Sequence, residues 1–275
     1  MIFRTYFPGY PLRSYVHHLF YFEGFMPVHR VDRFLPDGNT EIIIDLTDEP
    51  KYIYDNDTLA EIQSCRNAWV SGMRTQPITI PSGQNHKMLI ISFHKGRSFP
   101  FYPLPADELT DQVVDAELIY GSAILELRNR LTEEPDIDRR FVLVEQFLCQ
   151  LAGDSLEQDT VTQCMQYAVQ RLVHSPGEVM MQHLSERIGY SQKHFVSLFK
   201  KHVGITPKRY MRILRFQQAV TAIEGLAQPE WSHLALDCGF YDQAHFANEF
   251  KRFSGFSPGE YLRRKSDTLN YIPIG

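Results

Sequence analysis

The chain has 275 residues, of which 43% are hydrophobic, a fraction that supports folded cores and excludes a fully disordered chain. Its length suggests one large or two ordinary domains. The sequence shows no signal-peptide pattern, no apolar run of about 18 residues, and four scattered cysteines without a CxxC pair. We therefore expect a cytoplasmic protein without a membrane segment, a disulfide framework or a zinc site.

The net charge of −5 is distributed unevenly along the chain. Residues 180–265 hold 13 Lys and Arg against 7 Asp and Glu, a net charge of +6, whereas residues 1–179 hold 15 against 25, a net charge of −10. A basic segment attracts nucleic-acid phosphates, and an acidic one opposes random adsorption to them. An uneven charge distribution is also compatible with ordinary solvation of the surface. The sequence motifs must therefore distinguish this interpretation from nucleic-acid binding.

Short apolar or β-branched runs, separated by turn sequences, occupy residues 1–105 and favour a small β-barrel or β-sandwich. The runs are residues 42–44, 52–54, 68–70, 78–80 and 88–93. Glu41 and Asp45 flank three isoleucines, so we expect at most one face of that strand to be buried.

Two amphipathic stretches follow, at residues 116–131 and 138–151, with apolar side chains at helical spacing. They suit packing against the β domain or against a second subunit equally well. Residues 153–155 are the expected linker, residues 160–174 form the next helix, and residues 175–177 end it. The tail, residues 267–275, is expected to fray.

One stretch of the chain occurs twice, beginning at His183 and again at His233. Two copies are too few for a solenoid, and they indicate a pair of like units. The matched positions include Gly189/Gly239, Phe195/Phe246, Phe199/Phe250, Gly204/Gly255, Pro207/Pro258 and Tyr210/Tyr261.

Each copy has the pattern of a helix-turn-helix. A short helix at residues 180–188 ends at Gly189, where glycine tolerates a left-handed backbone. Ser191 then caps a second helix whose buried face carries Phe195, Leu198 and Phe199. Asp242 is the corresponding cap in the second copy. The outward faces carry amide, hydroxyl and cationic side chains, which match base edges in the DNA major groove.

Residues 160–265 resemble the DNA-binding domain of AraC/XylS-type transcription regulators. The most specific residues of this resemblance are Ala235, Gly239, Phe240, His245, Phe246, Phe250, Lys251, Arg252, Gly255, Phe256, Ser257, Pro258 and Tyr261. The resemblance implies a linking helix, supplied here by residues 207–226, and often a cupin-like β-barrel that precedes it. It also implies double-stranded DNA and RNA polymerase as partners, and a homodimer held by helices such as those at residues 116–151.

The outward side chains of the two units are the expected DNA contacts, and the resemblance places Lys193, Val196, Ser197, Gln243, Ala244 and Asn248 on the groove-facing side. Base reading is expected from Gln192, Lys193, Val196, Ser197, Gln243, Ala244, His245 and Asn248. Phosphate contacts, which make up about half or more of such interfaces, are expected from Ser191, Lys200, Lys201, Arg209, Arg212, Lys251 and Arg252.

The β domain offers candidates for an effector pocket but none for catalysis. An enzyme is not expected, because the sequence has no GxSxG, phosphate loop or GxGxxG. Metal-dependent cupins carry an HxH pair, whereas His17 and His18 are adjacent and are expected on opposite faces of a strand; no metal or other cofactor is expected. A small-molecule pocket and a plain barrel core both fit Phe34, Tyr52, Tyr54, Trp69, Arg74 and Phe93.

We therefore expect an α+β protein with two domains. Residues 1–154 form a β-rich, cupin-like sensing or dimerisation domain with strands in 1–105 and helices in 106–154. Residues 155–266 form an all-α double helix-turn-helix with units at 180–204 and 231–255. The expected function is sequence-specific transcription regulation, as an activator modulated by a small molecule. The alternatives are a regulator without a ligand and a cupin-type enzyme fused to a DNA-binding module.

Overall fold

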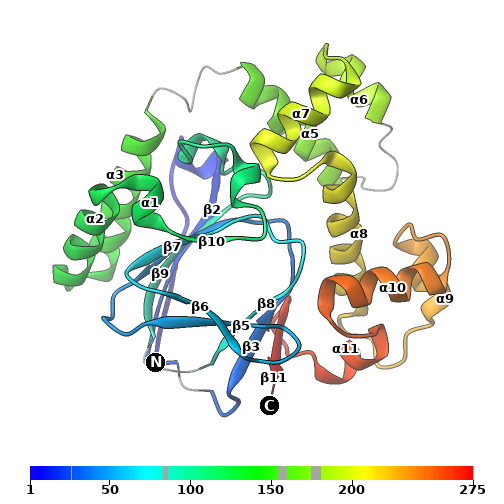
Figure 1. Ribbon diagram of the computed structural model, residues 1–275, viewed down its shortest axis with the longest axis horizontal. Helices are drawn as coiled ribbons and strands as arrows, with labels where there is room; N and C mark the ends of the chain where they lie inside the picture. Colours follow the sequence, from blue (N-terminus) through cyan, green and yellow to red (C-terminus); the bar gives the residue numbers. More distant parts are fainter. Residues whose placement is uncertain (26, 83–85, 154–159, 175–180, 275) are drawn as a thin grey trace.

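A computed structural model describes residues 1–25, 27–82, 86–153, 160–174 and 181–274. Two antiparallel sheets with three helices on one side form the N-terminal part, and an all-helical C-terminal part lies beside them (Figure 1). This confirms the expected fold class. The sheets form a sandwich rather than a closed barrel, because within the described ranges no ladder joins a strand of one sheet to a strand of the other.

Sheet A has six strands in the order β1-β2-β9-β4-β7-β10. They are β1 (Ile2–Tyr6), β2 (Val16–Glu23), β4 (Glu41–Asp45), β7 (Ala68–Ser71), β9 (Lys87–Phe93) and β10 (Val113–Asp115). Sheet B has five strands in the order β11-β3-β8-β5-β6. They are β3 (Val31–Phe34), β5 (Lys51–Tyr54), β6 (Glu61–Cys65), β8 (Ile78–Pro81) and β11 (Tyr271–Ile274). Each apolar run expected as a strand lies in one of them.

Strand β4 corrects one expectation about burial. Ile42, Ile43 and Ile44 are all buried, and Asp45 is 0% exposed, so both faces of this strand are covered. The reason is its position: β4 lies between β9 and β7 in the middle of sheet A. Ile42 and Ile44 pack into the core shared with the helices of the N-terminal part, while the alternate side chains face sheet B.

The helices of the N-terminal part are α1 (Ala116–Tyr120), α2 (Ser122–Glu133) and α3 (Ile137–Ala152). The single helix expected over residues 116–131 is in fact two, because Gly121 has a φ of +62° that ends α1. Ile124, Leu127 and Leu131 of α2 and Phe141, Val144 and Leu148 of α3 are buried against sheet A.

The C-terminal helices confirm the repeat. They are α5 (Thr160–His174), α6 (Met181–Ile188), α7 (Gln192–Val203), α8 (Pro207–Ile223), α9 (Trp231–Asp237), α10 (Gln243–Ser254) and α11 (Pro258–Arg264). We call α6 with α7 the first unit and α9 with α10 the second unit. The expected linker at residues 154–155 and the helix break at 175–177 lie outside the described residues.

The tail does not fray. Beyond α11, strand β11 pairs with β3, so the end of the chain completes a sheet of the N-terminal part. Ile272 is 0% exposed and belongs to the core of the helical part, together with Leu35 and Met73 from the N-terminal part. Pro273 is tolerated because β11 is an edge strand. The two parts of the chain therefore share one continuous core.

Candidate functional site

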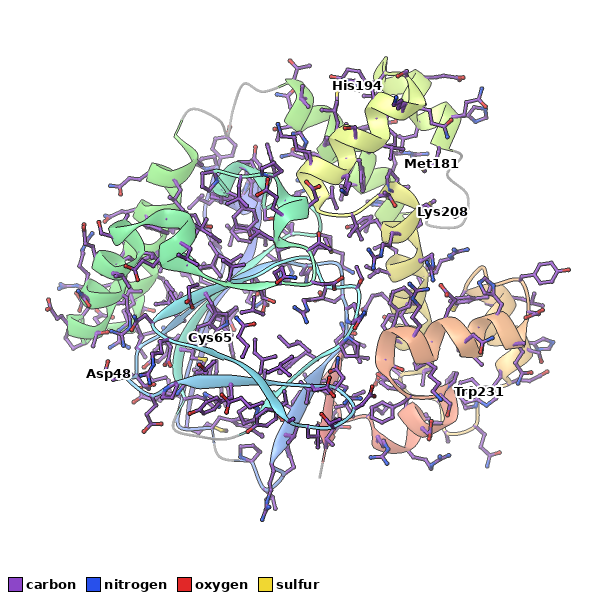
Figure 2. All side chains as sticks on the ribbon, in the orientation of Figure 1. Asp48, Cys65, Met181, His194, Lys208 and Trp231 are labelled. Atoms are coloured by element: carbon purple, nitrogen blue, oxygen red, sulfur yellow. The ribbon has the colours of Figure 1, made fainter. Side chains whose placement is uncertain are left out.

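The two helix-turn-helix units lie at opposite ends of the linking helix α8. In Figure 2, His194 marks the first unit and Trp231 the second, with Lys208 near the start of α8. Tyr210, Phe216 and Val220 of α8 are fully buried, so the helix is packed along its length. The two units are therefore mounted on one packed helix.

Local capping sets the direction of each second helix. The Ser191 side chain accepts a hydrogen bond from the His194 backbone amide at 3.3 Å, and Asp242 accepts one from His245 at 2.7 Å. Both helices end at glycines in the left-handed region, Gly204 and Gly255. These caps confirm the helix boundaries and leave the outward faces of α7 and α10 open.

The outward faces hold the side chains expected to read bases. Val196 is partly buried and packs against the core. The other seven side chains are exposed, namely Gln192, Lys193, Ser197, Gln243, Ala244, His245 and Asn248. His245 has a structural role as well, since its Nδ1 accepts the Tyr241 backbone amide at 3.3 Å and its ring meets Phe240 edge-on. The expected core phenylalanines Phe195, Phe199, Phe246 and Phe250 are 0% exposed.

The side chains expected to contact phosphate fall into two groups. Lys201, Lys251 and Arg252 are exposed on α7 and α10, and Ser191 is the helix cap described above. Three other cations already have protein partners.

Arg212 forms a two-pronged pair with Glu249, Nε to Oε2 and Nη2 to Oε1, both at 2.6 Å. This pairing lowers the pKa of the Glu249 carboxyl and ties α8 to α10, so Arg212 positions the second unit. Lys200 and Arg209 pair instead with the N-terminal part: Lys200 Nζ lies 2.9 Å from Asp107 Oδ2, and Arg209 Nη2 donates to Thr75 Oγ1 at 2.8 Å.

The space between the sheets gathers only some of the expected effector residues. Trp69 is partly buried and packs against the cluster of Ile53, Cys65 and Val113. Ile53 and Cys65 belong to sheet B, so Trp69 faces this space. Phe34 is 39% exposed and lies on the opposite face of β3 from Arg33, which is buried and packs over the Phe256 ring of the helical part. Tyr52 and Tyr54 lie on the other face of β5 from Ile53.

Phe93 does not face this space. It is 0% exposed and belongs to the core beneath the helices, because it lies on the side of β9 that faces them. Arg74 is largely buried, and its Nε lacks a hydrogen-bond partner in the described part of the chain. Phe34, Trp69 and Arg74 therefore remain as pocket candidates.

A polar seam at the start of β4, made of Asp37, Glu41, Ser92 and Lys95, was not predicted from the sequence. Burial raises the pKa of Glu41 to about 7, and the nearby charge of Asp37 adds to the effect. Burial also raises the pKa of Asp37, and the nearby Lys95 charge lowers it. The Ser92 hydroxyl donates a hydrogen bond to Glu41 Oε1 at 2.8 Å. Tyr210 of α8 packs beside Gly38. The only signal for this seam in the sequence is two carboxylates near an apolar run.

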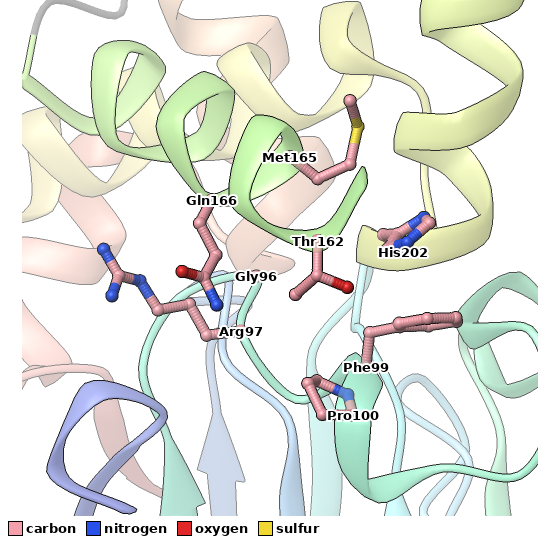
Figure 3. A pocket seen from close by; sticks show the side chains of 8 residues that line it. All are labelled: Gly96, Arg97, Phe99, Pro100, Thr162, Met165, Gln166 and His202. Atoms are coloured by element: carbon pink, nitrogen blue, oxygen red, sulfur yellow. The ribbon is translucent and has the colours of Figure 1, made fainter. Parts of the chain in front are cut away.

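A small cavity lies where α5 and α7 meet the loop after β9 (Figure 3). It is lined in part by Arg97, Gln166 and His202 and measures about 10 Å³, room for about one water molecule. The buried Gln166 Nε2 has no protein partner among the described residues, which suits a water at that point. The cavity is too small for an effector.

The histidines of the β domain require one correction. His17 and His18 do not point to opposite faces: a β-bulge between Val16 and His18 brings their Nδ1 atoms to 2.6 Å. In the residues that the structure describes, no group of three or more His, Cys, Asp or Glu side chains is arranged to hold a metal ion. Within the same ranges, no helix is long and apolar enough to cross a membrane.

Comparison with known proteins decides the type of the C-terminal part. Residues 184–264 match a family model described as a helix-turn-helix domain. The HTH-type transcriptional activator RhaS of Escherichia fergusonii is 30% identical over 96 residues, which cover 35% of this chain and 34% of RhaS. The C-terminal domain is of the AraC/XylS type.

Other matches also cover only part of the chain. An uncharacterized HTH-type transcriptional regulator of Haemophilus influenzae is 32% identical over 89 residues, or 32% of this chain and 29% of that protein. The chain thus spans about a third of the length of these curated relatives. Residues 4–115 match a model described as a domain of unknown function, DUF6597.

Among solved structures, ToxT of Vibrio cholerae with a bound unsaturated fatty acid aligns over 89% of this chain and 94% of its own. The identity is 10% and the TM-score is 0.44.

Proposed function

We propose that the protein is a sequence-specific, double-stranded-DNA-binding transcription regulator of the AraC/XylS type. The observation that carries the proposal is the pair of capped, exposed helices α7 and α10 mounted on the buried helix α8. Their outward faces offer Lys193 and Ser197 in one unit and Gln243 and Asn248 in the other. Amide side chains suit adenine, lysine suits guanine, and hydroxyls suit either.

Selection of the full-length protein against a pool of random duplexes tests this proposal. We expect enrichment of two short boxes about one helical turn, or about 10 bp, apart. A pool that shows no enrichment with the full chain, and none with residues 155–275 when circular dichroism shows the shorter chain to be folded, would remove the proposal. Enrichment with the shorter chain alone would show that the N-terminal part restrains the reading helices.

We further propose that a small molecule binds between the two sheets and modulates DNA binding. Phe34 pairs with Ile78 of β8 and so lies on the face of sheet B that packs toward sheet A, where it and Trp69 both retain exposed surface. The Lys51–Asp45 ion pair, at 3.4 Å, crosses the same space. Apolar walls with a few polar groups are typical of small-molecule sites. Saturable heat-stabilisation by one compound of a metabolite library supports this role.

The second candidate is a regulator whose N-terminal part only pairs subunits or binds a protein. It is favoured by the exposed apolar side chains of α1 and α3, among them Leu118 at 80% and Val142 at 46% exposure. A homodimer through these helices is compatible with either role. Activation through RNA polymerase is proposed by analogy with relatives named as activators. A Leu118→Asp variant that stays dimeric in sedimentation would exclude this face as the dimer interface.

A further inference from the structure

The acidic loop at residues 105–111 packs against the end of the first reading helix. This loop, which includes a short 3₁₀ helix (Ala106–Leu109), lies between strands β9 and β10 of sheet A. Thr110 Oγ1 donates to the Gly204 carbonyl oxygen at 2.6 Å. The contact is close: a Cβ atom at Gly204 would lie 3.0 Å from that same hydroxyl.

The loop presents carboxylates to two cations of the DNA-binding domain. Asp107 pairs with Lys200 at 2.9 Å. Asp111 accepts from the Thr75 hydroxyl at 2.6 Å and lies 3.9 Å from Arg209. Lys200 lies in the last turn of α7 and Arg209 in the first turn of α8. The two carboxylates therefore contact cations on both sides of the turn that joins α7 to α8.

We propose that the loop at residues 105–111 is an intramolecular competitor for DNA, with Asp107 and Asp111 occupying cations that a phosphodiester would otherwise contact. The inference rests on the proposed function, which assigns Lys200 and Arg209 to phosphate contacts. DNA binding then requires that the loop gives up these cations or that DNA binds without them.

The expected size follows from counterion release. Each phosphate that a cation neutralises makes the slope of log K against log salt steeper by about 0.9. One cation released from the loop therefore strengthens binding about five-fold near physiological salt. The ion pairs themselves are partly exposed, with Lys200 at 52%, so breaking them costs little stability.

The test compares full-length wild type with Asp107→Asn, which keeps the shape of the side chain and removes its charge. DNA affinity is measured by fluorescence anisotropy on the duplex recovered by selection, at several salt concentrations. The matched control is Asp48→Asn, which makes the same charge change. Asp48 is 98% exposed, pairs with Arg128 of α2, and lies on the far side of the sheets from α7 (Figure 2).

We expect Asp107→Asn to bind about five-fold more tightly than wild type with a steeper salt slope, and Asp48→Asn to match wild type. In the double variant Asp107→Asn/Lys200→Ala the gain should disappear. Equal affinity and slope for wild type and Asp107→Asn overturn the inference, as does a gain that survives loss of Lys200. If neither protein binds any duplex, the proposed function fails, and the inference fails with it.

Discussion

The side-chain amides of Gln217 and Asn270 donate to each other, at 2.8 and 3.0 Å, and so join the linking helix α8 to the residue before strand β11. The same Gln217 amide also donates to the Pro36 carbonyl oxygen at 2.8 Å. Gln217 is 7% exposed, so these bonds are shielded from water. One glutamine therefore holds together the linking helix, the chain end and the N-terminal part.

Loss of this amide should destabilise the whole chain. Gln217→Ala leaves the Asn270 amide and the Pro36 carbonyl without their partner, and a buried polar group left unsatisfied costs about 1–3 kcal/mol. We expect the free energy of unfolding in urea to fall by that amount. Gln218→Ala, an exposed position on the same helix, is the control, and an equal loss in both variants would refute the role given to Gln217.

Strand β11 should be a structural element and not a dispensable tail. Ile272 is 0% exposed, and truncation of a buried isoleucine to alanine costs about 2–5 kcal/mol. Ile272→Ala should lower the thermal midpoint by several degrees, whereas Ile62→Ala, 64% exposed on the edge strand β6 of the same sheet, should leave it unchanged. Equal midpoints for the two variants would show that β11 contributes nothing.

Base reading and phosphate contact can be separated by sequence preference. Lys193→Ala or Asn248→Ala should weaken binding to the preferred duplex by about 1–3 kcal/mol with folding intact, because both side chains are exposed on the reading faces. Lys201→Ala should weaken binding to all duplexes alike. A uniform loss in the first two variants would assign them to the phosphate backbone.

The seam at Glu41 predicts a pH dependence of stability. With its pKa raised by burial to about 7, folded Glu41 holds a proton that the unfolded chain releases above its ordinary pKa of 4.5. The contribution of Glu41 to the free energy of unfolding is therefore complete at low pH and is lost as the pH rises through about 7.

Glu41→Gln should remove that loss, because glutamine remains neutral and still accepts the bond from Ser92. Urea unfolding at about pH 5 and about pH 8 measures the effect. The variant should lose less stability than wild type over this interval, and exposed Glu61→Gln should behave as wild type. A wild-type-like decline in Glu41→Gln would disprove the assignment.

Local signals explain why the helical domain was predicted well. The boundaries of α5, α7 and α10 follow from helical period, the caps Ser191 and Asp242, and the closing glycines. These features act over a few residues, so the sequence contains them directly. The central strands β4 and β9 were recognisable for the same reason, as short apolar runs.

Long-range contacts could not be predicted in this way. Residues 271–274 contain a proline and resemble a loose tail. Ile272 nevertheless pairs with Arg33 of strand β3, which is far away in sequence. The pairing of Lys200 with Asp107 and the bulge that turns His17 toward His18 likewise depend on tertiary packing. The cations expected on DNA were identified by type, but nothing local to them indicates a competing carboxylate.

In the proposed function, α7 and α10 read DNA together from one rigid frame. Insertion of about 5 bp, half a helical turn, between the two selected boxes tests it directly, because the second box then faces the opposite side of the duplex. We predict that the affinity falls to that of a duplex with a single box. Unchanged affinity for the inserted duplex would contradict a rigid pair of reading helices.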